Sequence, residues 1–232
     1  MQVDFHASSL SASPKYNGVP KYKSTSVESQ QDENNYTLKT IGLNSNNETI
    51  EVLHTTYENG RMTKEWADYD GDNKPDAVDE WEYDDNQNIT TWKQDHNGDG
   101  LYDTLEKTKF DDHGNIIAWG VDSNMDGKAD DINLYEYEYD ENGNVTSFKA
   151  DYDGDGTFDR AERSEYDDNG NIILKLINYD NDSMNDEQVT YEYNAAGGLT
   201  GETHQYFNAD GSSATEVLMY DGNGKLLSKA MK

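Results

Sequence analysis

Apolar and polar residues alternate in short runs along most of this chain. Residues 132–139 (INLYEYEY) and 104–110 (TLEKTKF) alternate with a period of two, which is typical of a strand with one solvated face. Residues 171–178 (NIILKLIN) are almost continuously apolar, as in a strand buried on both faces. No segment shows a sustained helical period, so the pattern predicts an all-β protein.

These runs belong to a tandem repeat of about 27 residues. The typical repeat carries an aromatic residue, then Asp, a turn sequence, a run, an acidic cluster and a second run, and the seventh repeat stops after its first run. The repeats, numbered 1 to 7, begin at Tyr57, Tyr83, Phe110, Tyr139, Tyr166, Tyr193 and Tyr220. Because a single repeat cannot bury a core of its own, the repeats are expected to stack on their neighbours.

Two kinds of turn separate the runs. Asn-Gly occurs at residues 59–60, 142–143 and 169–170, with His-Gly at 113–114, and predicts tight hairpin turns with positive φ at both central residues. Repeat 2 has Asn-Gln at 86–87, for which we expect another turn type. The second connection is the acidic cluster. We therefore predict an antiparallel meander of hairpin repeats, elongated or curled, with a β-propeller-like arrangement as the alternative.

The chain divides by composition into three parts. Residues 1–35 are rich in Ser, Lys, Gln and Asn without periodicity, and we expect a disordered arm or linker there. Residues 36–56 alternate only in places, which favours a degenerate repeat or an N-terminal cap. Residues 57–232 form the predicted repeat domain.

Charge dominates the composition. The chain has 48 Asp and Glu against 18 Lys and Arg, a formal net charge of −30, and 33% hydrophobic residues. Such values alone favour disorder, but 17 Tyr, 5 Phe and 4 Trp indicate a folded chain whose acids have a partner. A surface this negative repels phosphate, so nucleic acid is not an expected partner.

Other features exclude further classes of protein. The chain has no Cys, so neither disulfides nor thiolate chemistry are available. It has no apolar run of membrane-spanning length, and its first residues show no export signal. The five His residues are scattered without a catalytic or zinc spacing, so we expect no enzymatic activity.

The acidic clusters follow a metal-binding spacing. Those of repeats 2 and 4 match D-x-[DN]-x-[DN]-G-x₅-E, the calcium loop of an EF-hand. Side chains at positions 1, 3, 5 and 9, a backbone carbonyl at position 7 and a carboxylate at position 12 surround the ion, and Gly at position 6 permits the turn. The candidate ligands are Asp95, Asn97, Asp99, Leu101, Asp103 and Glu106 in repeat 2, and Asp151, Asp153, Asp155, Thr157, Asp159 and Glu162 in repeat 4.

Three other repeats carry weaker versions, and we expect binding to weaken in the order 1, 3, 5. The candidate ligands are Asp68, Asp70, Asp72, Asp76 and Asp79 in repeat 1, Asp122, Asn124, Asp126, Lys128 and Asp130 in repeat 3, and Asn178, Asp180, Asp182 and Asp186 in repeat 5. Position 6 is Asn73 in repeat 1 and Ser183 in repeat 5. Position 12 is Asn133 in repeat 3 and Val189 in repeat 5. Repeat 6 has lost the acids, and no site is expected there.

The donor set indicates the ion. Oxygen ligands without His or Cys favour Ca²⁺ over zinc or copper, and Mg²⁺ prefers to keep its waters. The alternative is a set of solvated Asp-Gly turns, but carboxylates about 4 Å apart repel by ~1 kcal/mol per pair even in water. We therefore predict three to five calcium ions.

The sequences that flank the clusters show no amphipathic helix, unlike those of an EF-hand. "NVTSFKA" precedes the cluster of repeat 4 and "RAERSEY" follows it, so the loop resembles the D-x-D-x-D-G-x-x-D loops in the β-propeller of integrin α subunits and, more loosely, the aspartate-rich repeats of thrombospondins. "YEYDENGNVTSF" and "SEYDDNGNIIL" resemble the YD repeats of rearrangement-hotspot proteins, over roughly residues 57–227. That resemblance implies β-hairpin spirals of bacterial surface and toxin proteins.

These features together favour a calcium-binding, calcium-stabilised bacterial protein, secreted or on the cell surface, with a structural or adhesive role. Two alternatives stay open. One is a module that recognises a glycan or another surface protein through aromatic columns such as Trp92, Trp119 and Phe148, or through a sheet edge. The other is a non-catalytic segment associated with a secreted toxin or enzyme.

Overall fold

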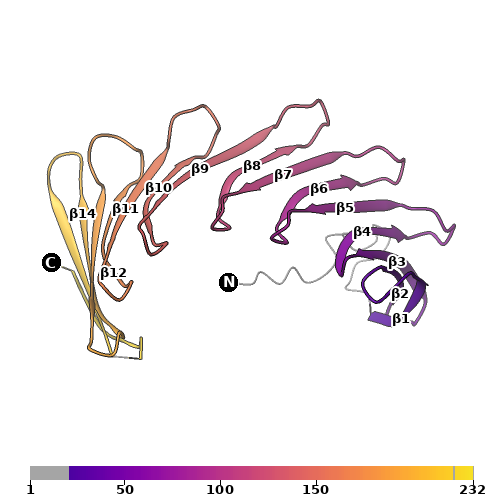
Figure 1. Ribbon diagram of the computed structural model, residues 1–232, viewed down its shortest axis with the longest axis horizontal. Coiled ribbons are helices and arrows are strands. Elements are labelled where there is room, and N and C mark those ends of the chain that lie inside the picture. Colours follow the sequence, from indigo (N-terminus) through magenta and orange to yellow (C-terminus); the bar gives the residue numbers. More distant parts are fainter. Residues whose placement is uncertain (1–20, 222, 232) are drawn as a thin grey trace. The chain divides into compact units, whose positions relative to one another are not determined.

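A computed structural model describes residues 21–221 and 223–231 of the chain (Figure 1). The described residues form strands and turns without any helix, so none of them offers a helix that could cross a membrane. The strands are β1 (Lys21–Gln30), β2 (Tyr36–Leu43), β3 (Thr49–Glu58), β4 (Arg61–Asp68), β5 (Ala77–Tyr83), β6 (Ile89–Asp95), β7 (Thr104–Phe110), β8 (Ile116–Asp122), β9 (Asp131–Tyr139), β10 (Val145–Asp151), β11 (Arg160–Tyr166), β12 (Ile172–Asn178), β13 (Glu187–Tyr193), β14 (Leu199–Phe207), β15 (Ser213–Tyr220) and β16 (Leu226–Met231).

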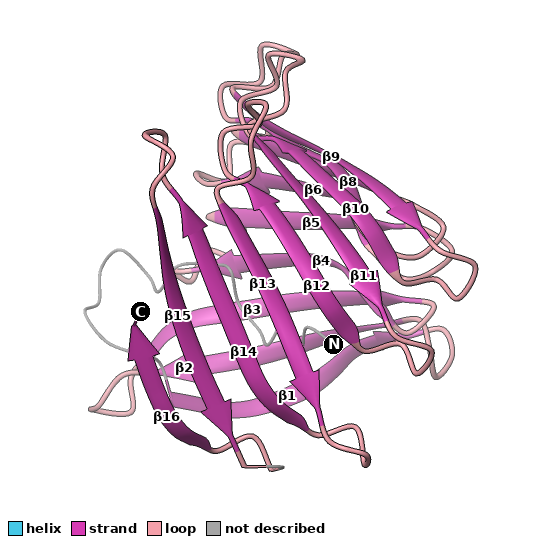
Figure 2. Ribbon diagram, turned by 90° about the vertical axis from the view of Figure 1, so that its left-hand side faces the viewer, coloured by secondary structure: helices cyan, strands magenta, loops and turns pink. Residues whose placement is uncertain are grey.

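The strands form a single meander sheet. Each strand is hydrogen-bonded to the next in chain order, from β1 to β16, and the pairs for which a register is defined are antiparallel. Figure 2 shows β11 to β16 side by side in this order. The predicted all-β meander of hairpin repeats is confirmed. The propeller alternative is wrong, because each blade of a propeller would be a separate sheet.

The chain divides into two compact units. The described part of the N-terminal unit comprises residues 21–109 and Trp119–Asp131, and the C-terminal unit comprises Phe110–Ala118 and the chain from Ile132 onward. Residues 21–30, expected to be disordered, instead form β1, which pairs with β2. Residues 36–56 contribute β2 and most of β3, a complete hairpin. The prediction for residues 1–20 lies outside the described residues.

Most hairpin turns are five-residue loops headed by Asp, not the tight turns predicted from Asn-Gly. In the loop from Asp140 to Asn144, the Asp140 carboxylate accepts the N–H groups of Asn142 and Asn144, each at 2.9 Å. Gly143 has positive φ and Asn142 does not. The Asp of each aromatic-Asp motif therefore stabilises a wider loop, because its side chain binds backbone two and four residues ahead.

The same loop recurs around Gly114 and Gly170, so the tight-turn prediction is wrong there too. For repeat 2 another turn type was expected, but the same five-residue loop forms there, with Gln87 (φ 76°) in the place of Gly. Only Asn59-Gly60 forms the predicted two-residue turn, with φ of 52° and 76° between the paired residues Glu58 and Arg61.

Strands on either side of an acidic cluster pair over a short stretch only. β4 and β5 share four residue pairs next to the cluster, and so do β10 and β11. Beyond those pairs the two strands diverge toward the hairpin turns. Tyrosines bridge the opening, because the hydroxyls of Tyr83, Tyr166 and Tyr193 donate to backbone carbonyls of the preceding hairpin at 2.6 to 2.9 Å. These bonds partner carbonyls that the shortened ladder leaves unpaired, so the tyrosines that begin repeats 2, 5 and 6 contribute to packing.

Apolar burial is greatest beside the acidic clusters. Ala67 and Ala150, each one residue before a cluster, are completely buried, and Val78, Ile177 and Val189 are nearly so. The clusters are therefore attached to the best-packed part of each unit.

Candidate metal loops

Each acidic cluster forms a loop of nine residues, which we number acidic loops 1 to 5. The loops are residues 68–76, 95–103, 122–130, 151–159 and 178–186. The first residue ends one strand, and the ninth directly precedes the next strand or lies within a few residues of it. Loops 1 to 3 belong to the N-terminal unit, and loops 4 and 5 to the C-terminal unit.

The Asp at position 1 organises loops 1 to 4. Its side chain is buried. One carboxylate oxygen accepts the N–H of position 6, and the other accepts N–H groups from positions 3 to 5. In loop 4 the two bonds reach Asp151 from Gly154 at 2.6 Å and from Gly156 at 3.0 Å. The position-6 bond is 2.9 or 3.0 Å in the other three loops.

Positions 3 and 5 continue the same scheme in all five loops. The side-chain oxygen of position 3 accepts the N–H of position 5, and that of position 5 accepts the N–H of position 7. In loop 4 the hydroxyl of Thr157 also donates to Asp155, and these bonds lower the pKa of Asp155. The predicted position-7 carbonyls of Leu101, Lys128 and Thr157 remain predictions.

Position 9 closes each loop. Asp159 accepts the N–H of Tyr152 at 2.6 Å and donates its own N–H to the carbonyl of Ala150 at 2.8 Å. The equivalent pair of bonds is present at Asp76, Asp103, Asp130 and Asp186. The loop is thus closed by hydrogen bonds at its ninth residue, three residues before the predicted closing carboxylate.

Positive φ occurs at positions 4 and 6, and sequence reasoning missed position 4. In loop 4 both are glycines, Gly154 at 69° and Gly156 at 89°. A Cβ on Gly154 would lie 1.9 Å from Cγ2 of Ile132, whereas one on Gly156 would meet nothing within 4 Å. The two glycines therefore serve different needs, close packing at position 4 and backbone conformation alone at position 6. The sequence signal for position 4 is the Asp-Gly-Asp-Gly series at residues 153–156, in which a second Gly stands two residues before that of position 6.

Two loops bring three carboxylates together. One oxygen each from Asp68, Asp70 and Asp76 lie within 4.8 Å of one another, and the same holds for Asp151, Asp153 and Asp159. In each group the first acid is buried and the other two are exposed or half-buried. Loops 2 and 3 have the amides Asn97 and Asn124 at position 3, so their oxygen sets carry less charge.

The predicted closing residues at position 12 lie elsewhere. In the strand after loop 4, Glu162 pairs with Phe148, which places its side chain on the sheet face opposite to that of Asp151. Its carboxylate instead accepts bonds from Arg160 and Lys175, each at 2.5 Å. Burial raises the pKa of Glu162, but these two cations outweigh it and lower the pKa below its usual range.

Asp79 and Glu106 follow the same alternation. The carboxylate of Asp79 is completely buried and accepts the indole N–H of Trp92 at 2.8 Å and the amide of Gln94 at 3.1 Å. Glu106, on β7, is paired with Trp92 on β6. An EF-hand helix returns position 12 to the ion, whereas a strand alternates its side chains and directs it to the other face. The structure therefore does not bring Asp79, Glu106 and Glu162 together with the carboxylates of the acidic loops.

Loop 5 departs at position 1. The amide of Asn178 donates to the carbonyl of Asp182 at 2.8 Å, in place of a carboxylate oxygen that would accept the position-6 N–H. Ser183 at position 6 has no positive φ. The remaining acids, Asp180, Asp182 and Asp186, keep the bonds of the other loops.

Shorter loops flank the series. Five-residue loops at Asn44–Glu48, between β2 and β3, and at Asn208–Ser212, between β14 and β15, stand where an acidic loop would otherwise connect two hairpins. The second of them belongs to repeat 6. Both loops are headed by Asn, whose side chain accepts or donates within the turn.

Little within the described chain offsets the loop charge. Among its ion pairs, a single one reaches a carboxylate at loop positions 1 to 9, the exposed pair of Lys74 with Asp72 at 2.8 Å. The other acids of the loops accept backbone and side-chain N–H or hydroxyl groups. The carboxylates grouped in loops 1 and 4 could therefore hold a metal ion.

Comparison with known proteins assigns the chain to no family. No family profile and no curated protein matches the sequence. Among solved structures, a Photorhabdus luminescens Tc holotoxin pore with a substituted TccC3 is 13% identical, with a TM-score of 0.43 over 91% of this chain and 14% of that one. A TcdB2-TccC3 structure is 12% identical, with a TM-score of 0.24 over 79% and 14% of the two chains. A porin-like protein from Bacteroides uniformis is 10% identical, with a TM-score of 0.32 over 89% and 92%. The chain thus spans about a seventh of the two toxin chains.

Proposed function

We propose that this chain is a calcium-binding, calcium-stabilised repeat protein with a structural role outside the cell. The observation that supports this best is the grouping of the carboxylates of Asp151, Asp153 and Asp159, and of Asp68, Asp70 and Asp76. Three like charges this close oppose folding unless a cation joins them. Calcium accepts such oxygen ligands without strict geometry, so it suits a loop already held by its own backbone bonds.

The chemistry of the ligands supports an extracellular location. Calcium loops in extracellular modules commonly bind at about 10⁻⁴ to 10⁻³ M, which matches the millimolar calcium outside cells. The structural role rests on the placement of the loops. Loops 1 and 4 each join two hairpins next to a fully buried residue, Ala67 or Ala150, so fixing the loop also fixes the junction of the two hairpins.

We also propose that the chain is not an enzyme. The four described histidines have structural neighbours. His54 stacks on Trp66 and binds Glu28, His96 lies 3.4 Å from the Thr104 hydroxyl, and His113 stacks on Tyr139. His204 lies between Glu187 and Glu202, 2.7 and 3.5 Å away. None of them lies in an arrangement of nucleophile, base and orienting group.

Calorimetric titration of metal-stripped protein with CaCl₂ tests the calcium proposal, together with thermal unfolding in calcium and in excess chelator. We expect three to five equivalents. Each loop saturated at 100 times its Kd contributes about 2.7 kcal/mol, so the melting temperature rises by several degrees or more per loop. Magnesium at equal concentration serves as the control and is expected to give a smaller rise. Identical melting curves in calcium and chelator would rule the proposal out.

A further inference from the structure

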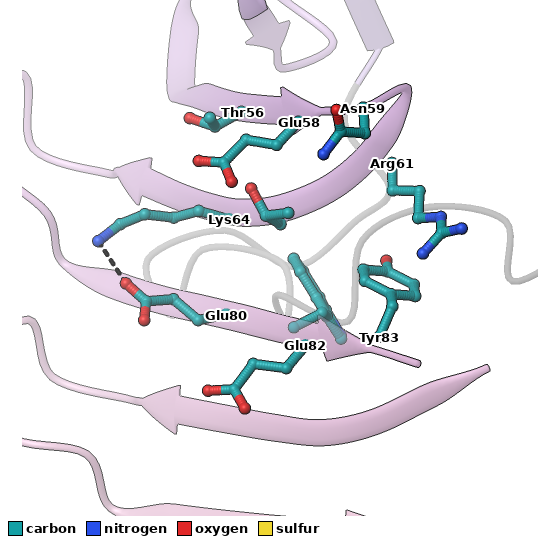
Figure 3. A pocket seen from close by; sticks show the side chains of 10 residues that line it. Thr56, Glu58, Asn59, Arg61, Lys64, Glu80, Glu82 and Tyr83 are labelled. Atoms are coloured by element: carbon teal, nitrogen blue, oxygen red, sulfur yellow. Dashed lines mark hydrogen bonds and ion pairs between the residues drawn. The ribbon is translucent and has the colours of Figure 1, made fainter. Parts of the chain in front are cut away.

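A groove opens in the N-terminal unit where β4 and β5 diverge, at the hairpin-turn end of these strands. It has a volume of about 460 Å³, within the range of small-molecule sites, and is lined by residues of β3, β4, β5 and the Asn59-Gly60 turn (Figure 3). Acidic loop 1 lies at the opposite end of the same strand pair. The groove and the loop are therefore separate sites.

One wall of the groove is aromatic and held in place. Tyr83 and Trp81 are half-buried on β5, and the guanidinium of Arg61 lies 5.5 Å from the centre of the Tyr83 ring. Figure 3 shows Arg61 beside Tyr83 at one end of the groove. Arg61 also donates to the carbonyl of Asp84 at 3.1 Å, and the Tyr83 hydroxyl to that of Met62. These contacts fix the wall before any ligand arrives.

The opposite rim is polar and also fixed. The N–H of Asn59 donates to the side chain of Asn35 at 3.0 Å, and the N–H of Gly60 to the carbonyl of Asn34 at 2.8 Å. Within the described chain, the carboxylate of Glu58, the side-chain amide of Asn59 and the indole N–H of Trp81 make no hydrogen bond. The groove thus offers an acceptor, an amide and a donor around an aromatic surface.

The charge of the groove is balanced, although the chain carries −30. Lys64 pairs with Glu80 at 2.6 Å, as drawn in Figure 3, and Lys93 pairs with Glu82 at 2.5 Å. The remaining charges are those of Glu58 and Arg61. A ligand with a net charge would disturb this balance, and an anion would also meet the negative field of the whole chain.

We propose that this groove binds a neutral oligosaccharide. A sugar ring has one apolar face, which stacks on an indole or phenol, and a rim of hydroxyls that both donate and accept hydrogen bonds. That combination matches the Trp81 and Tyr83 wall and the free groups of Glu58 and Asn59. A cationic peptide fits less well, because two of the three carboxylates are already paired.

A second groove in the C-terminal unit provides an internal contrast. It opens between β10 and β11, has a volume of about 320 Å³, and is lined by Tyr137, Phe148 and Ile172 among others. Its charged groups and one tyrosine are already bonded, since Glu162 accepts bonds from Arg160 and Lys175 and the Tyr166 hydroxyl donates to a backbone carbonyl. Its ionic groups are therefore paired, whereas Glu58 in the first groove is not.

Titration with cellohexaose, mannohexaose and N-acetylchitohexaose, followed by NMR of the tryptophan indole N–H signals, tests the proposal. We expect at least one of these probes to shift the Trp81 signal at millimolar concentration. Trp81→Phe lacks the reporting indole, so the affinities of the variants are measured by calorimetry. Trp81→Phe and the exposed Glu58→Ala should each weaken the binding about tenfold, a loss that corresponds to 1.4 kcal/mol. Ser164→Ala, in the second groove, should leave it unchanged.

Oligogalacturonate and hexalysine serve as charged controls. Failure of all three neutral probes to shift Trp81, or binding that both groove variants leave intact, would overturn the proposal, and so would tighter binding of hexalysine at the groove. Running each titration in calcium and in chelator separates this result from the calcium proposal. Saccharide binding without any effect of calcium would support the groove proposal and not the calcium proposal. An effect of calcium without saccharide binding would support the calcium proposal and not the groove proposal.

Discussion

Acidic loops 4 and 5 have the same length and lie in the same unit, yet their first residues differ in one of two bonds. In loop 4 both oxygens of Asp151 accept backbone N–H groups, from Gly154 and Gly156. In loop 5 the side-chain oxygen of Asn178 still accepts the N–H of Asp180 at 3.3 Å, but its NH₂ group donates to the carbonyl of Asp182. The exchange of one carboxylate oxygen for NH₂ reverses the direction of that bond, because an amide NH₂ donates and does not accept.

The comparison separates what the hairpin needs from what a metal site needs. Loop 5 keeps the closing bond of position 9, from the N–H of Tyr179 to Asp186 at 2.6 Å, and its strands pair as in loop 4. It lacks positive φ at position 6 and the group of three carboxylates found in loop 4. Chain reversal therefore depends on position 9, and the proposed metal site depends on position 1.

Asp151→Asn should give loop 4 the bonding of loop 5, and this is the largest effect we expect. The substitution removes one ligand charge and the acceptor for Gly156, so calcium affinity at this loop should fall by at least tenfold and the titration should lose one equivalent. Asp168→Asn, an exposed residue outside the loops, makes the same charge change as a control. A titration that keeps its full stoichiometry would contradict the role of position 1.

The reverse change should build a site. Asn178→Asp with Ser183→Gly supplies both the missing carboxylate and the glycine that adopts positive φ, so we expect one added equivalent of calcium and a higher melting temperature in calcium. Ser183→Gly alone is the control and should lack the added equivalent. An unchanged stoichiometry in the double variant would show that positions 1 and 6 are not what distinguishes the two loops.

The two glycines of loop 4 should differ in cost. Ala at either position has to adopt positive φ, a strain of about 1–2 kcal/mol. Ala at position 154 must also displace Ile132, so Gly154→Ala should lower the free energy of unfolding more than Gly156→Ala. Urea denaturation in chelator measures both without a contribution from metal. Equal losses would mean that the contact with Ile132 relaxes without cost.

A substitution at position 7 of loop 4 should have the smallest effect, a change in the pKa of Asp155. The Thr157 hydroxyl and the backbone N–H lower the pKa of Asp155 from its ordinary value of 3.8, whereas loop 5 has Met184 at this position. A lowered folded-state pKa contributes stability above pH 3.8, and that stability is lost as the pH falls through the folded-state value. Thr157→Met should raise the Asp155 pKa toward 3.8 in an NMR titration. Thr157→Ser keeps the hydroxyl and should leave the pKa low.

The sequence was sufficient for features that depend on neighbours along the chain. Period-two alternation gave the strands, the 27-residue repeat gave the meander, and the spacing of acids located all five loops. The Asp and Gly residues that shape a turn act within a few residues of themselves, so their order is enough to place a reversal of the chain. The same local signals misjudged turn size, since the side chain of Asp140 stabilises five residues where Asn-Gly alone suggested two.

Only the tertiary structure decided which side chains meet. Glu162 has the right spacing for a calcium ligand, but the register of β10 with β11 places it on the opposite face from Asp151, beside Arg160 and Lys175. The groove at Trp81 arises because β4 and β5 stop pairing after four residues, which no single segment encodes. Spacing along a chain fixes local turns, whereas the face of a side chain and the gap between strands depend on pairing with residues that are distant in sequence.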